Sequence, residues 1–141
     1  MKREHRWVVA ALLLGVLVLP ACREVTTESP TESEPYRVEP VEGTDLARVI
    51  LTEDGAQRIG LETAMVVESD AGSVVPASAI WIDVDGQEWV YTIPEALTFV
   101  REPIVVDRYE DDAAVLEDGP EPGTEVVTVG VAELIGSELG I

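Results

Sequence analysis

Histidine and cysteine are almost absent from this 141-residue chain. It contains one histidine, His5, and one cysteine, Cys22. A single cysteine cannot form an internal disulfide bond. His5 falls in a segment that we expect to be removed, so the mature protein has no histidine. This excludes Ser-His and Cys-His catalysis as well as any histidine-ligated metal site.

Basic residues are also scarce. Lysine and arginine together number 9 against 28 aspartates and glutamates, which gives a formal net charge of −19 at pH 7. A chain this acidic will not bind nucleic acid through its phosphates. We therefore expect no nucleic-acid partner.

The N-terminal segment lacks an apolar run long enough to cross a membrane. The uncharged apolar stretch from Trp7 to Leu19 has 13 residues, whereas a transmembrane helix needs about 20. The stretch follows the basic residues Lys2, Arg3 and Arg6 and is followed by small residues, which is typical of a secretory signal. We predict a signal peptide over residues 1–21.

The residues Leu19-Pro20-Ala21-Cys22 resemble the lipobox of bacterial lipoproteins. This resemblance implies cleavage before Cys22 and attachment of lipid, palmitate among the acyl chains, to Cys22. Two or more acyl chains hold a protein firmly on a bilayer, whereas one holds it only marginally. The expected location is the cell membrane, lipid-anchored on its extracytoplasmic face. An ordinary signal peptide followed by an incidental cysteine is the alternative.

An acidic spacer is expected over residues 22–44. It carries six glutamates and three prolines, and its apolar residues are few and unpatterned. Such a segment cannot offset its ordering entropy by burial, so we predict a disordered, self-repelling tether. Binding of cations or cell-wall material is the alternative role for the acidic run. The folded domain is predicted to cover residues 45–141.

Within that domain, short strands separated by glycine- and proline-rich turns predict an all-β barrel or sandwich. One short helix interrupts the strands: Thr52 is a good N-cap, acidic residues follow it, and Gly60 suits the C-terminal end. Residues 131–139 are predicted to form a closing helical turn. About 97 residues can bury one small core.

The centre of the domain, from Ser73 to Thr92, is predicted to be a β-hairpin. Asp85-Gly86 between two apolar runs favours a two-residue type I′ turn. In that register Ile82 faces Trp89 and both point into the core.

The same register places Trp81 and Val90 on the outer face of the hairpin. A tryptophan beside an aliphatic residue can anchor a protein interface. Trp81 and Val90 are therefore the candidate partner-binding residues, and a single exposed aromatic with no partner is the simpler alternative.

Two groups of carboxylates are candidate cation sites. Asp83 and Glu88 face each other in the predicted register, and a cation such as Ca²⁺ could relieve their repulsion. The residues Asp107 and Glu110–Asp112 form a similar group. Solvated carboxylates on a very acidic surface are the simpler explanation of both groups. Ser78 has no histidine to activate it, so we predict no catalytic residue, no metal, no cofactor and no enzyme activity.

The segment Val75–Ile80, followed by a hairpin that ends in Trp89-Val90-Tyr91, resembles the membrane fusion proteins, the periplasmic adaptor subunits of efflux pumps. The glycine and valine spacing from Leu116 to Gly130 and the segment Ala47–Val67 are similar to the same family. The family has a lipoyl-like domain and a long α-helical hairpin between these blocks, and here only residues 69–72 separate them.

The resemblance implies a lipid-anchored, non-catalytic accessory subunit. It would dock on an integral membrane transporter of the RND or ABC type and contact the bilayer through the Cys22 anchor. Self-association of the chain is a further alternative. The alternative is a stand-alone cell-envelope lipoprotein that binds a ligand or a cation and shares only the small β fold.

Overall fold

The computed structural model describes residues 34–141. The predicted signal peptide, Cys22 and the first part of the predicted tether lie outside the described residues. None of the helices within residues 34–141 has the length and apolar character needed to cross a membrane.

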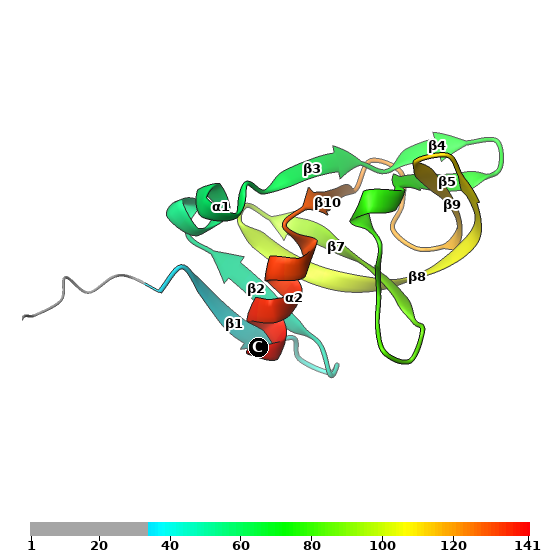
Figure 1. Cartoon of the computed structure of the whole chain (residues 1–141). Coiled ribbons are helices and arrows are strands. Elements are labelled where there is room, and N and C mark those ends of the chain that lie inside the picture. The colour runs from blue at the N-terminus through cyan, green and yellow to red at the C-terminus, as the bar shows by residue number, and fades with distance from the viewer. Residues whose placement is uncertain (1–33) are drawn as a thin grey trace, which may run out of the picture. The chain divides into compact units, whose positions relative to one another are not determined.

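The described residues form ten strands, two α-helices and one short 3₁₀ turn (Figure 1). In chain order they are β1 (Tyr36–Pro40), β2 (Ala47–Leu51), α1 (Glu53–Ile59), β3 (Glu62–Met65), β4 (Val67–Ser69), β5 (Gly72–Pro76), η1 (Ala77–Ala79), β6 (Trp81–Ile82), β7 (Glu88–Glu95), β8 (Thr98–Glu110), β9 (Ala113–Asp118), β10 (Glu125–Val129) and α2 (Val131–Leu139).

The strands form an antiparallel, barrel-like sheet in the order β3-β10-β7-β8-β9-β5-β4. The first and last strands of this order, β3 and β4, are separated by Val66 alone, so the chain itself nearly closes the sheet. The amide of Val66 donates to the carbonyl of Thr124 at 2.8 Å, which continues the β3–β10 pairing past the end of β3. The predicted all-β small barrel is confirmed.

Both faces of strands β7 and β10 are buried. Neighbouring residues on a strand point to opposite faces. Val90 and Val126 belong to one core cluster, formed mainly by the barrel strands. Tyr91 and Val127, the next residues along, belong to a second cluster. The second cluster includes Leu134, so α2 covers the outer face of these strands.

Local sequence signals mark both ends of α1 and the C-terminal end of α2. The Oγ1 atom of Thr52 accepts a hydrogen bond from the amide of Gly55 at 3.0 Å, and Gly60 ends α1 in the left-handed conformation with φ 64°. These are the capping interactions that the sequence predicts. Helix α2 ends in the same way, at Gly140 with φ 69°.

The predicted domain boundary at Asp45 is wrong. Strand β1 lies inside the predicted tether and pairs with β2 from Tyr36↔Leu51 to Pro40↔Ala47. The carbonyl of Pro35 accepts a hydrogen bond from the amide of Thr52 at 2.9 Å. β1 buries little of its own surface and is held by backbone pairing, which composition does not reveal.

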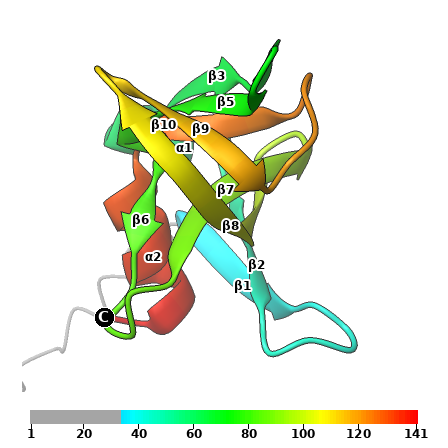
Figure 2. The same ribbon diagram turned by 90° about the vertical axis from the view of Figure 1, so that its right-hand side faces the viewer.

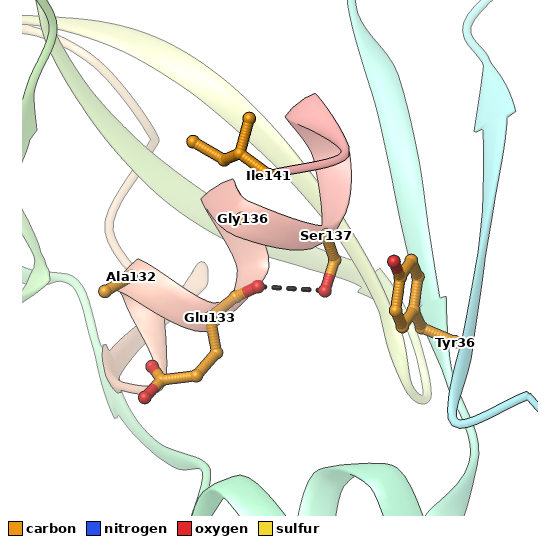
Figure 3. Close-up of a pocket in the computed structure, with 6 residues that line it drawn as sticks. All are labelled: Tyr36, Ala132, Glu133, Gly136, Ser137 and Ile141. Atoms are coloured by element: carbon orange, nitrogen blue, oxygen red, sulfur yellow. Dashed lines mark hydrogen bonds between the residues drawn. The ribbon is translucent and has the colours of Figure 1, made fainter.

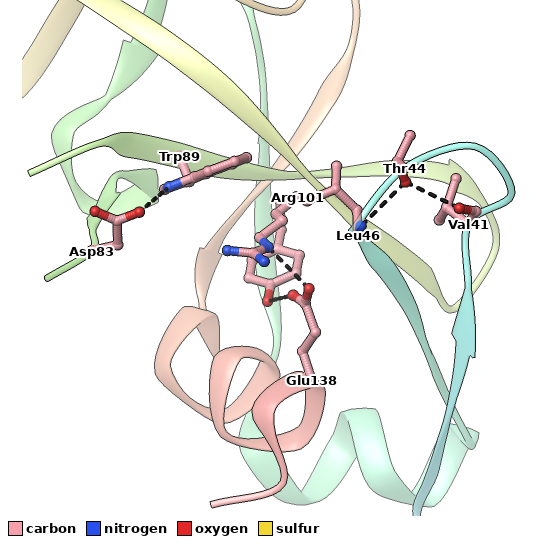
Figure 4. Close-up of polar contacts among 8 residues, drawn as sticks. Val41, Thr44, Leu46, Asp83, Trp89, Arg101 and Glu138 are labelled. Atoms are coloured by element: carbon pink, nitrogen blue, oxygen red, sulfur yellow. Dashed lines mark hydrogen bonds and ion pairs between the residues drawn. The ribbon is translucent and has the colours of Figure 1, made fainter. Parts of the chain in front are cut away.

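The turn between β1 and β2 is ordered as well. The hydroxyl of Thr44 donates to the carbonyl of Val41 at 3.1 Å and accepts from the amide of Leu46 at 3.2 Å (Figure 4). The folded unit therefore begins about ten residues earlier than the acidic composition suggests.

Candidate interaction site

The central hairpin has a three-residue loop. The amide of Asp83 donates to the carbonyl of Gln87 at 2.9 Å, and the amide of Gly86 donates to the carbonyl of Asp83 at 3.1 Å. Gly86 has a φ of 83°. A four-residue turn followed by a left-handed residue is the usual form of such loops. The predicted two-residue turn at Asp85-Gly86 is wrong by one residue.

This shift places Trp81, and not Ile82, on the same face of the hairpin as Trp89. Trp81 pairs with Trp89, and Ile82 pairs with Glu88. A one-residue slip moves every side chain of a strand to the opposite face. Ile82 is accordingly 55% exposed. Val90 is 0% exposed because a core cluster covers each face of β7. Val90, predicted to bind a partner, lies inside the core and cannot contact one.

Trp81 is also placed differently from the prediction. Its side chain is half-buried and packs against the second core cluster, next to α2. The guanidinium carbon of Arg101 lies 6.0 Å from the centroid of its ring. Trp81 thus supports the base of the hairpin and does not stand free on an outer face.

Asp83 organises the loop. Its Oδ1 atom accepts hydrogen bonds from the amides of Asp85 and Gln87, both at 2.9 Å. Its Oδ2 atom accepts from Nε1 of Trp89 at 3.0 Å (Figure 4). The hydrogen bond from Trp89, followed by that from the Gln87 amide, lowers the pKa of Asp83. The carboxylate therefore favours its ionised form and fixes the loop on both sides.

Asp83 and Glu88 do not face each other. Asp83 stands opposite Gln87, and Glu88 stands opposite Ile82. The Oε1 atom of Glu88 accepts instead from the hydroxyl of Tyr109 at 2.8 Å. The like-charge opposition that prompted the idea of a bound cation is therefore absent from this hairpin.

A polar contact ties the hairpin to α2. Nε of Arg101 donates to Oε1 of Glu138 at 2.9 Å, and the hydroxyl of Tyr91 donates to Oε2 of the same carboxylate at 2.5 Å. Burial, together with the hydrogen bond to Glu138, raises the pKa of Tyr91. The Arg101 guanidinium carbon lies 4.6 Å from the ring centroid of Trp89, within cation–π range.

The loop at the end of this ordered hairpin exposes apolar surface. Val84 is fully exposed, at 101%, and Ile82 is 55% exposed. The hairpin extends away from β3 and β5 (Figure 2). The two aliphatic side chains are thus presented to the surroundings from a loop that Asp83, Trp89 and Arg101 hold in place.

A cleft between β1 and α2 is the other candidate. It has a volume of about 430 Å³ and is lined by Tyr36, Ala132, Glu133, Gly136, Ser137 and Ile141 (Figure 3). The Ser137 hydroxyl donates to the carbonyl of Glu133 at 2.9 Å and is thus engaged within its own helix. Few polar groups converge on this cleft, so the hairpin loop is the better-defined site.

The remaining candidate residues do not come together to form a site. Within the region from residue 34 onward, no three histidine, cysteine, aspartate or glutamate side chains gather closely enough to hold a metal ion. Arg108 pairs with Asp107 at 2.6 Å and with Glu110 at 2.7 Å. Ser78 is exposed on η1.

Sequence reasoning missed two features of the site. The role of Asp83 has a signal, since aspartate at the first and glycine at the fourth position favour a type I turn, here Asp83 to Gly86. The pair Arg101–Glu138 has no local signal, because its members lie 37 residues apart.

No protein-family model, curated protein or solved structure matches this chain.

Proposed function

We propose that this chain is a lipid-anchored, non-catalytic accessory subunit that docks on an integral membrane transporter through the β6–β7 hairpin. The observation that carries the proposal is the fully exposed Val84 on an ordered loop. An aliphatic side chain in that position gains nothing from water and is free to enter a partner's pocket.

Order in the loop favours binding. Association costs free energy when side chains and loops must be immobilised. Here the Asp83 carboxylate already holds the amides of Asp85 and Gln87, and the amide side chain of Gln87 donates to the carbonyl of Ile104 at 3.2 Å. The loop therefore needs little further ordering when a partner binds.

The negative charge around Val84 indicates which kind of surface a partner would present. Val84 stands between Asp83 and Asp85 on a chain of net charge −19. A complementary partner has an apolar pocket with lysine or arginine at its rim, because opposed like charges suppress association. This is the chemistry that we assign to the transporter's extracytoplasmic surface.

The lipid anchor would keep the hairpin near that surface. Eleven residues, 23–33, separate Cys22 from the first described residue. A chain of that length reaches at most about 40 Å. Anchoring at such a distance raises the effective concentration of the domain at the membrane. The likeness of Val75–Tyr91 and Leu116–Gly130 to periplasmic adaptors supports the same assignment.

Photo-crosslinking in intact cells tests the proposal. A benzophenone amino acid is placed at Val84 of the full-length chain and, as a control, at the exposed Asp45 of the β1–β2 turn. We expect Val84 to capture one specific polytopic membrane protein that Asp45 does not capture. Val84→Asp is expected to reduce co-purification of that protein without lowering the melting temperature.

Other outcomes would refute the proposal. If both positions capture the same proteins, or if Val84 captures only lipid or wall material, the chain is a stand-alone lipoprotein. Cys22→Ser tests the anchor separately, since a protein that stays processed and membrane-bound after this change is not held by a lipid on Cys22.

A further inference from the structure

A second exposed apolar surface lies on β3, β4 and β5, away from the hairpin loop. The sheet there forms a groove of about 400 Å³ together with the β8–β9 turn. Its floor is apolar and its rim is acidic. We call it the acidic-rimmed groove, with floor residues Met65, Val67, Val74 and Pro76 and rim residues Asp111 and Asp112.

The floor residues are not needed for the core. Val66 and Val75 point inward and are 2% and 0% exposed. Their neighbours Met65 and Val67 point the other way and are 53% and 54% exposed. Val67 is paired with Val74, so these two side chains lie on the same face. A half-buried strand in a soluble sheet normally carries polar residues on this face.

The rim carries uncompensated negative charge. Glu110 is paired with Arg108 at 2.7 Å, but Asp111 and Asp112, the next residues, make no ion pair with any residue between 34 and 141. Asp111 adopts a left-handed φ of 52° at the tip of the turn. The turn thus holds two free carboxylates beside the apolar floor.

We infer that the acidic-rimmed groove binds a protein segment in which apolar side chains alternate with lysine or arginine. The apolar side chains would cover Met65 and Val67, and the basic ones would reach Asp111 and Asp112. A second copy of this chain or an anionic bilayer is a poor occupant, because a net charge of −19 repels both. The inference does not depend on the function proposed for the hairpin loop.

Peptide binding to the full-length chain in detergent micelles tests this inference. The probe is a fluorescein-labelled Lys-Leu-Lys-Val-Lys peptide, followed by anisotropy at low and high salt. Two comparison peptides separate the contributions: Lys-Ser-Lys-Ser-Lys keeps the charge without the apolar residues, and Glu-Leu-Glu-Val-Glu keeps the apolar residues and reverses the charge. We expect the first peptide to bind best, more weakly at high salt, and the glutamate peptide not to bind.

Matched variants locate the binding. Asp111→Asn with Asp112→Asn should weaken binding roughly three- to tenfold, since each rim charge contributes modestly; asparagine tolerates the left-handed φ of Asp111. The control, Glu42→Gln with Asp45→Asn, removes the same charge from the β1–β2 turn and should change binding less than about twofold. Val67→Ser should weaken it at least about threefold.

Three results would overturn the inference. Equal weakening by the two charge variants would show that the peptide responds only to overall charge. An unchanged affinity in Val67→Ser, or equal binding of the lysine–serine peptide, would show that the apolar floor takes no part. Circular dichroism of each variant shows whether a loss of binding reflects unfolding.

Discussion

Arg101 on β8 and Glu138 on α2 form an ion pair, with 2.9 Å between Nε and Oε1, that is largely withdrawn from water. Their side chains are 16% and 4% exposed. The same carboxylate accepts the hydroxyl of Tyr91, and the guanidinium lies against Trp89 at the base of the hairpin. One glutamate near the C-terminus therefore connects α2 to the strand that carries the candidate site.

Removing one partner of this pair should be costly. Glu138→Ala leaves the guanidinium of Arg101 and the hydroxyl of Tyr91 without their acceptor in a poorly solvated place. We expect the free energy of unfolding to fall by about 2–4 kcal/mol, measured by urea denaturation. The control, Glu133→Gln, changes an exposed carboxylate on the same helix and should cost less than about 1 kcal/mol.

Replacing both residues together separates the cost of an unpaired buried charge from the cost of lost packing. Replacing both members, Arg101→Met with Glu138→Leu, should recover part of the stability lost in Glu138→Ala, because no buried charge is then left unpaired. A loss below about 0.5 kcal/mol in Glu138→Ala would show that the pair contributes nothing to holding α2.

Features with local causes could be predicted from the sequence. The ends of α1 follow from Thr52 and Gly60, since a hydroxyl at the first turn and a left-handed glycine at the last act within a few residues. The closing helical turn predicted over residues 131–139 is observed as α2. The all-β class follows from such short, alternating segments.

Features with distant causes could not be predicted. The hairpin register is a different case: Asp85-Gly86 favours a two-residue turn, and the competing local signal is Asp83 with Gly86 at the first and fourth positions of a type I turn. Strand β1 looks like spacer by composition and is ordered only because β2 pairs with it. The exposure of Ile82 follows from that register, whereas Val90 is buried because a core cluster covers each face of β7. The predicted interaction face was therefore wrong.

Gly55 tests whether the chain before β2 belongs to the folded unit. A Cβ atom at this position would lie 2.3 Å from the carbonyl oxygen of Pro35, and that same oxygen accepts the amide of Thr52. Gly55→Ala should therefore push β1 away and cost about 1–3 kcal/mol, even though alanine favours helix elsewhere. Thermal unfolding of the full chain measures the loss.

The matched control for this change is Gln57→Ala. Gln57 is exposed on the same helix, and its replacement should leave stability unchanged or slightly improved. If Gly55→Ala stabilises the protein as a simple helix substitution would, then Pro35 does not pack on α1 and the folded unit begins later than β1.

The pH response of the hairpin follows from Asp83. Its pKa lies below the ordinary value of 3.8, chiefly because Trp89 donates to its carboxylate and the Gln87 amide does so next. A lowered pKa in the folded state means that the ionised carboxylate stabilises the fold. This contribution is fully present above about pH 4 and is lost as the pH falls through the lower, folded-state pKa.

Carboxyl ¹³C titration by NMR should therefore give Asp83 a pKa below 3.8, and Trp89→Phe should raise it, because phenylalanine keeps an aromatic face for Arg101 but has no indole N–H. Tyr109→Phe is the control: it removes the hydroxyl that donates to Glu88, the neighbouring carboxylate, and should leave Asp83 unchanged. The same pKa in wild type and Trp89→Phe would mean that the indole does not hold Asp83. The loop that presents Val84 would then lack the order on which the docking role proposed for it depends.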